Sequence, residues 1–160
     1  MGASSVAGLC GVVRQEGDPS RLVWGGLRTG ETDVYGARVG AEGELIDGPA
    51  ALGGFPVNAY PGREELPVAA FDGSRFVATL PSAVGIFAAR IGGDGMVLDL
   101  PLTGPGLAVA RPASKWRSSD ALSVDVPTVV QAAGGETLFI WVDNPYSGTT
   151  RSIRGAWYAW

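Results

Sequence analysis

Residues 34–47 read VYGARVGAEGELID, and residues 86–99 read IFAARIGGDGMVLD. The second segment begins 52 positions after the first (34 to 86), and most of its residues exchange like for like. Five pairs are identical: Ala37 and Ala89, Arg38 and Arg90, Gly40 and Gly92, Gly43 and Gly95, and Asp47 and Asp99. Because the spacing from Arg to Asp is also equal, we interpret this segment as the constant part of an internal repeat.

The composition favours one folded, turn-rich domain spanning residues 1–160. Hydrophobic residues make up 46% of the chain and charged residues only 18%, which argues against disorder, and 25 Gly and 11 Pro favour many turns over long helices. The formal net charge of -4 gives no basic footprint for nucleic acid. No apolar run reaches the roughly 18 residues that a membrane helix needs. We therefore expect no nucleic-acid partner and no membrane insertion.

Short strands joined by glycine-containing turns run through the middle of the chain. LPVAAFDGSRFVATL (66–80) predicts a hairpin, because Asp72-Gly73 suits the positive backbone dihedrals of a tight turn. GIFAARIGGDGMVLD (85–99) predicts a second hairpin, with its turn at residues 92–95. The four strands are expected at about 67–71, 75–80, 85–91 and 96–99.

The same order fits the other two thirds of the chain. In the first part the expected strands are 5–14, 21–27, 33–39 and 43–47. In the last part, residues 126–143 form a hairpin around Gly134-Gly135, and residues 152–160 form a third strand whose Gly155-Ala156 matches Gly36-Ala37. The sequence therefore predicts an all-β fold of three four-stranded antiparallel meanders, at about 5–47, 67–99 and 127–160, the last lacking its fourth strand.

Repeats of 40 to 55 residues with four strands each are typical of propeller blades. The segments VYGARVGAEGELID, VAAFDGSRFVAT and VWGGLRTGETDVYGARV resemble blades of a β-propeller repeat family found in large secreted or surface proteins of GC-rich bacteria. That family carries a Trp-x-Asp-x-Arg-x-Gly loop, which Trp24, Arg28 and Gly30 match except that Gly26 stands in place of Asp. Trp141 and Asp143 match it in the last copy, whereas the middle copy has no Trp. The resemblance implies propeller-like blades and favours an extracellular or cell-surface location; a two-sheet β-sandwich and a piece of a longer propeller are the alternatives.

The chain lacks the residues that most catalytic sites need. It has no histidine, which excludes Ser/His/Asp and Cys/His sites, and one cysteine, Cys10, which excludes an internal disulfide. No phosphate-binding loop occurs, and Asp47, Asp72 and Asp94 precede glycines in turn signals. We expect a protein that is not an enzyme and that uses no cofactor and no metal.

Two kinds of connection differ in length between the copies, and we expect them to lie on one face. Since variable loops on a rigid scaffold commonly carry binding, we expect function at residues 25–33, 48–66, 81–85, 100–126 and 143–151. Aromatic rings stack on sugars, so the candidate ligand-binding residues are Trp24, Arg28, Trp116, Trp141, Asp143, Asn144 and Tyr146. Packing of Trp24 and Trp141 between blades is the favoured alternative to ligand contact.

Two further features bear on assembly. Arg38 and Arg90 recur one repeat apart, which favours a structural ion pair with an aspartate of a neighbouring turn. In GAWYAW (155–160), Tyr158 and Trp160 share one face of a strand and Trp157 lies on the other, which predicts burial on both sides. Three blades are too few for a ring, so we expect closure by a homo-oligomer.

The sequence thus favours a non-catalytic binding or structural module that assembles with itself into a closed ring or a larger surface assembly. A lectin that binds a glycan through the variable loops is one alternative. A structural subunit of a virion or appendage, whose open edges polymerise, is the other. A protein ligand also remains compatible with the variable loops.

Overall fold

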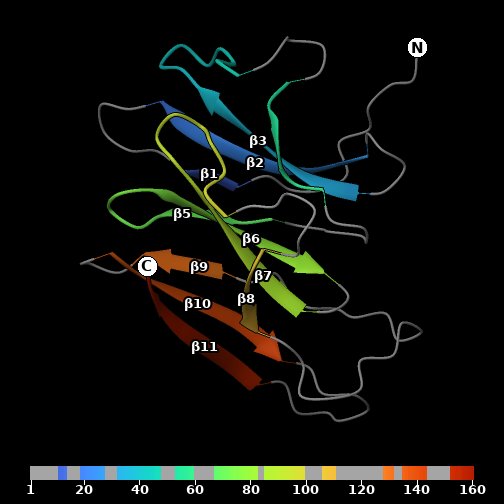
Figure 1. The fold of residues 1–160 in the computed structure, drawn as a ribbon, viewed down its shortest axis with the longest axis vertical. Helices are drawn as coiled ribbons and strands as arrows, with labels where there is room; N and C mark the ends of the chain where they lie inside the picture. Colours follow the sequence, from blue (N-terminus) through green and yellow to red (C-terminus); the bar gives the residue numbers. More distant parts are fainter. Residues whose placement is uncertain are drawn as a thin grey trace.

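A computed structural model of the chain describes residues 11–13, 19–27, 32–47, 53–59, 67–82, 85–99, 106–110, 128–131, 135–143 and 152–160. In these ranges every regular element is a β-strand, and the strands form three antiparallel sheets (Figure 1). The all-β prediction is therefore confirmed. None of the described segments forms a helix long and apolar enough to cross a membrane.

The strands follow one another within each sheet. The first sheet has the order β1 (Gly11–Val13), β2 (Ser20–Leu27), β3 (Thr32–Val39) and β4 (Phe55–Asn58). The second has β5 (Ala69–Phe71), β6 (Phe76–Ser82), β7 (Gly85–Ile91) and β8 (Leu107–Ala110). The third has β11 (Ser152–Ala159), β10 (Glu136–Asp143) and β9 (Thr128–Gln131). Three antiparallel meanders are thus present, and three described strands make up the last.

The predicted position of the fourth strands at 43–47 and 96–99 is wrong. Each segment follows a tight turn that ends at Gly43 or Gly95, with φ of 87° and 89°, and returns to its third strand by a single bridge, Val39 to Leu45 or Ile91 to Val97. The carboxylate of Asp47 accepts a bond from the backbone N–H of Arg38 at 2.6 Å. The Asp47 side chain therefore occupies the hydrogen-bonding position on Arg38 that a fourth strand would need in order to continue the sheet.

The fourth strands are β4 and β8, and both have the same register. Val34, Tyr35 and Gly36 pair with Asn58, Pro56 and Phe55, and the residues 52 positions later, Ile86, Phe87 and Ala88, pair with Ala110, Ala108 and Leu107. The register shift also occurs at the same place in both sheets. The repeat therefore continues past Asp47 and Asp99, and the segments 48–66 and 100–126, predicted to be variable connections, contain its fourth strands.

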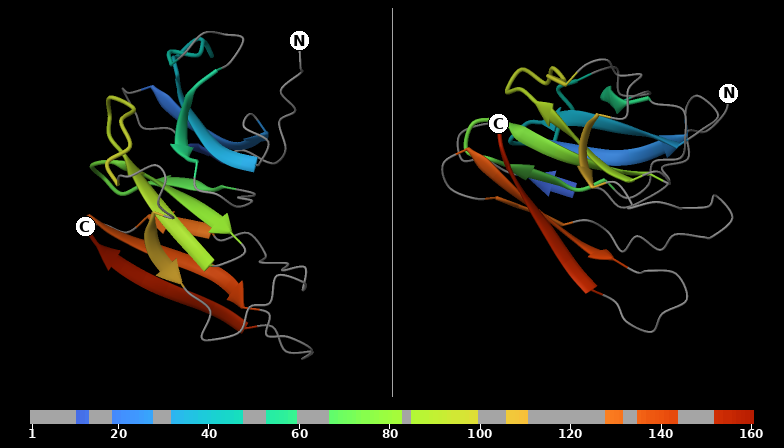
Figure 2. Two further views of the ribbon diagram at one scale, coloured as in Figure 1. Left: turned by 45° about the vertical axis from the view of Figure 1, so that its right-hand side comes forward. Right: turned by 60° about the horizontal axis from the view of Figure 1, so that its bottom comes forward.

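The three sheets follow one another along the long axis of the molecule as layers, and the described strands do not close into a ring (Figures 1 and 2). A buried apolar cluster joins the first two sheets through Val23, Val34, Val57, Phe76, Leu80 and Phe87. A second cluster joins the opposite face of the second sheet to the third through Val77, Ile86, Val109 and Phe139, with Tyr158 and Trp160 packed against it. Since side chains alternate along a strand, the second sheet is covered on both faces.

Candidate functional site

Two of the three tryptophans of the predicted ligand site, Trp24 and Trp141, hold equivalent positions in their sheets. Trp24 pairs with Tyr35, the residue before Gly36, and Trp141 pairs with Arg154, the residue before Gly155. Trp24 is only 9% exposed and stacks on Tyr35 with ring centroids 6.2 Å apart. Trp141 is partly buried against the cluster that joins the second and third sheets. Neither indole ring is fully exposed to solvent, where a ligand could stack on it.

The other predicted site residues fall largely outside the described part of the chain. Asp143 is the last residue of β10. Outside the described residues lie Arg28, Trp116, Asn144 and Tyr146. The predicted ligand-binding set as a whole therefore stays a prediction.

The repeated arginines form ion pairs, as the sequence predicts. Arg38 Nη2 lies 2.7 Å from Asp47 Oδ1, and Arg90 Nη2 lies 2.6 Å from Asp99 Oδ1. In each pair the arginine Nε and backbone N–H also donate to the same carboxylate. Such bidentate, charge-assisted bonds fix geometry as well as charge. We call each pair an Arg–Asp clamp.

The clamps shift the pKa values of Arg38, Asp47 and Arg90. The hydrogen bond to Asp47 raises the pKa of Arg38, although partial burial opposes it, and Arg90 is raised in the same way by Asp99. Burial of Asp47 favours a higher pKa, but the bonds and charge from Arg38 outweigh it together with the charge of Arg21, so the pKa of Asp47 lies below its usual value. The carboxylate is thus held in its charged form.

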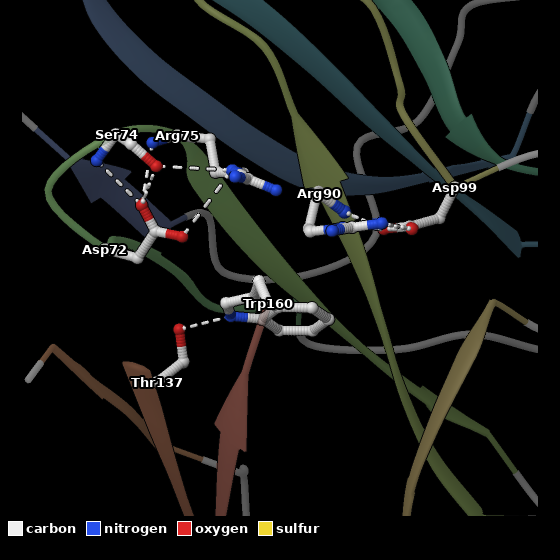
Figure 3. Close-up of polar contacts among 7 residues, drawn as sticks. All are labelled: Asp72, Ser74, Arg75, Arg90, Asp99, Thr137 and Trp160. Carbon is white, nitrogen blue, oxygen red and sulfur yellow. Dashed lines mark hydrogen bonds and ion pairs between the residues drawn. The ribbon is translucent and has the colours of Figure 1, made fainter. Parts of the chain in front are cut away.

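Each clamp also meets the sheet that follows it. A Cβ on Gly95, in the turn of the second sheet, would lie 3.4 Å from Arg38 Nε. The Arg90 guanidinium lies over the Trp160 ring, 4.9 Å from its centroid, and Trp160 donates to Thr137 Oγ1 at 2.8 Å (Figure 3). Each clamp therefore contacts the sheet that follows it and helps to fix its position, which is a structural role.

Asp72, a carboxylate that belongs to neither clamp, also stabilises local structure. Asp72 Oδ1 accepts bonds from the backbone N–H groups of Ser74 and Arg75 at 2.8 and 2.7 Å, which closes the turn between β5 and β6 (Figure 3). Among the described residues no group of three or more His, Cys, Asp or Glu could hold a metal ion.

The third sheet presents an apolar surface that nothing in the described structure covers. Its side chains come from the face opposite Phe139 and Tyr158: Ile153 is 78% exposed and Trp157 is 60% exposed, with Leu138 and Ile140 half-buried behind them. We call Leu138, Ile140, Ile153, Gly155 and Trp157 the outer surface of the third sheet. Large exposed apolar patches mark interaction sites, so this surface is the candidate functional site.

Trp157 limits one prediction and reveals a signal in the sequence. Within the described part of the chain GAWYAW is buried on one face only: Tyr158 and Trp160 pack against the second sheet, whereas Trp157 lies on the face that no described sheet covers. Burial of that second face stays a prediction. Gly36-Ala37-Arg38 and Gly155-Ala156-Trp157 are equivalent, because Gly and Ala hold the same pairing positions. Trp157 thus stands where the earlier sheets have a clamp arginine, a difference visible in the sequence one residue beyond the repeated Gly-Ala.

Comparison with protein-family models, with curated proteins and with solved structures found no match to this chain. The functional argument therefore rests on the chain's own residues.

Proposed function

We propose that this chain is a non-catalytic, propeller-like structural and binding module that assembles through the outer surface of the third sheet. The observation that carries the proposal is the exposure of Ile153, whose equivalents Val34 and Ile86 are buried, together with that of Trp157, which stands where the earlier sheets have a half-buried clamp arginine. The resemblance to repeats of secreted and surface proteins favours an extracellular or cell-surface setting for the assembly.

The order of the sheets supports this proposal. The Trp141 face of the third sheet packs on the second, and the equivalent Leu80 face of the second packs on the first. Each sheet thus receives the next one on its opposite face, and the outer surface of the third sheet is the next receiving face. Repeat arrays that end in a free, soluble unit place polar residues there, whereas this surface carries Ile153 and Trp157.

A second copy of the chain is the simplest partner, since head-to-tail contacts between identical units generate rings or open filaments. The face that would come next in line is the Trp24 face of the first sheet in that copy. Trp24 and Tyr35 are buried within their own chain. This contact therefore requires the residues that bury them to move. The rotation between successive copies decides the form of the assembly: a closed ring results if the rotations return to the first copy, and an open polymer of the appendage type results if they do not.

The test is the mass of the chain in solution, with one matched pair of variants. We expect a defined oligomer for the native chain, dissociation for Trp157→Glu, and no change for Met96→Glu, because Met96 is 64% exposed but lies in a turn of the second sheet. Placing a charge in a desolvated contact costs several kcal/mol. A native chain that stays monomeric at all concentrations would overturn the proposal.

A lectin is the second candidate, because the exposed Trp157 indole could stack on a sugar. Sugar sites also need polar groups to hold hydroxyls, and Ile153, Gly155 and Ala159 flank Trp157 on its side of β11. The chemistry of this surface favours a protein partner over a sugar. A glycan array that gives binding sensitive to Trp157→Ala would reverse that preference.

A further inference from the structure

Four of the seven exposed large apolar side chains of the described residues lie in the two segments that end in the clamp aspartates. They are Leu45 and Ile46 of the first sheet, 40% and 43% exposed, and Met96 and Leu98 of the second, 64% and 48% exposed. We call these four residues the turn surface. A single exposed apolar residue is common, but a group of them marks an interaction site.

The clamps hold the backbone of the turn surface in place. The Ile46 N–H donates to the Arg38 carbonyl at 2.9 Å, and the Leu98 N–H donates to the Arg90 carbonyl at 2.8 Å. The residue that follows Ile46 or Leu98 is the clamp aspartate itself. The two sheets thus present an exposed apolar side chain at the same position of the repeat, on a backbone that is already fixed. A fixed surface loses little conformational freedom when a partner binds.

The spacing of the turn surface suits a helix. Its two segments lie next to each other at one end of the stack of sheets (Figures 1 and 2), and a Cβ on Gly95 would lie 3.7 Å from Asp47 Oδ2. Because packed sheets lie about 10 Å apart, Ile46 and Leu98 are separated by about that distance. Side chains at i and i+7 share one face of a helix and are about 10 Å apart. Side chains on one face of an extended strand recur at about 7 or 14 Å.

Acidic side chains border the turn surface. Glu42, Glu44 and Asp94 are exposed and precede the four apolar residues in the chain. The clamp arginines are already neutralised by their aspartates. Arg21, at the same end of the first sheet, is buried and donates to two backbone carbonyls. The acids described here therefore favour a partner that carries Lys or Arg.

We infer that the turn surface binds a basic amphipathic helix of another protein, with apolar residues at i, i+4 and i+7 and with Lys or Arg beside them. The apolar residues at i and i+7 meet Ile46 and Leu98, and the basic side chains pair with Glu42, Glu44 and Asp94. This surface belongs to the first two sheets, whereas the assembly contact belongs to the third. The inference therefore goes beyond the proposed function and does not depend on it.

Three labelled synthetic peptides of about 18 residues, or about five helical turns, test the selectivity. The first places Leu at helical spacing and Lys elsewhere. The second has the same composition but alternates Leu and Lys as an exposed strand does, and the third is the first with Glu in place of every Lys. In anisotropy titrations against the full chain, we expect the first peptide to bind about tenfold more tightly than either of the others. Its circular dichroism should show more helix when it is bound.

Variants of the chain locate the contact. Ile46→Ser and Leu98→Ser should each weaken the helical peptide about tenfold, because each removes one apolar contact. Leu27→Ser is the matched control: Leu27 is 44% exposed, close to the 43% of Ile46, but it lies at the opposite end of β2 from Arg21, which pairs with the clamp arginine. Leu27→Ser should leave the affinity unchanged. Unchanged melting temperatures confirm that the three variants are folded.

The charged part of the contact has its own test. Binding of the helical peptide should weaken as salt is added, because salt screens exposed charges. Glu44→Gln should reduce this salt dependence, since it removes one of the acids beside the turn surface.

Several outcomes would overturn the inference. These are equal binding of the helical and alternating peptides, equal binding of the Lys and Glu peptides, or an equal loss of affinity in Leu27→Ser and Leu98→Ser. Loss of the peptide in a folded Trp157→Glu chain would place its site on the third sheet and would also overturn it. A Trp157→Glu chain that is monomeric and binds the helical peptide normally separates the turn surface from the assembly contact, so either proposal can fail alone.

Discussion

The second and third sheets place the same residue type at the same repeat position with opposite results. Ile86 of β7 is 3% exposed, whereas Ile153 of β11 is 78% exposed. Ile86 contributes to the cluster that receives the third sheet, and β8 runs beside its strand. Ile153 has neither a fourth strand beside it nor a sheet above it among the described residues. The comparison teaches that burial in this repeat is supplied by the neighbours of a strand and not by the strand itself.

The largest expected effect comes from truncating these two isoleucines. Ile86→Ala should lower the free energy of unfolding by about 2–5 kcal/mol, because it leaves a cavity between two sheets. Ile153→Ala should change it by less than about 0.5 kcal/mol, as for an exposed site. Denaturant unfolding of both variants at low protein concentration gives the measurement. A comparable loss at Ile153 would mean that this face is covered in solution.

The next comparison sets Gly36 against Gly155. Gly36→Ala should destabilise the chain by about 1–2 kcal/mol, because the new methyl group would press on Val57 and Phe55 of β4. Gly155→Ala should be close to neutral, since none of the described strands lies above it and the reduced freedom of the unfolded chain offsets the contact with β10. Thermal unfolding of the two variants checks this. Equal losses would show that β11 already carries a fourth strand.

The smallest effect concerns the clamp of the first sheet. Because the folded pKa of Asp47 lies below its unfolded value of about 3.9, the unfolded state binds more protons between the two values, and stability rises with pH there. The contribution of Asp47 is therefore complete above about pH 4 and is lost as pH falls through the lower folded value. Asp47→Asn should flatten this part of the acid-unfolding curve.

Asp94→Asn is a partial control for the clamp, since Asp94 accepts a local bond from the Met96 backbone N–H at 3.0 Å and acts on Arg38 through its charge without bonding to it. It should leave the slope between pH 2 and 4 closer to that of the native chain than Asp47→Asn does. If both substitutions flatten the curve equally, the clamp has no special part in acid stability.

Much of the architecture could be predicted from local signals. Glycines at turns such as Asp72-Gly73 and the two similar segments 52 positions apart located β5 to β7 to within two residues, because hairpins depend on neighbouring residues. The fourth strands could not be located in this way. The Asp47 and Asp99 segments looked like strands, but their side chains bond back to Arg38 and Arg90 and end the ladder, a contact across nine residues.

The candidate site was less predictable. The sequence pointed to aromatic residues near variable loops, and Trp24 proved buried, whereas Trp157, expected to be covered, proved exposed. An alternating pattern says which side chains share a face of a strand, but not whether another sheet covers that face.

The sequence by itself determined the strand type, the turns and the repeat, since these follow from backbone preferences and from comparison of its own copies. It also determined the absence of histidine chemistry and the replacement of the clamp arginine by Trp157. Only the tertiary structure decided that β4 and β8 complete the first two sheets and that the third sheet has an apolar face uncovered by the described chain. Burial depends on contacts between residues far apart in the sequence, and no local pattern contains that information.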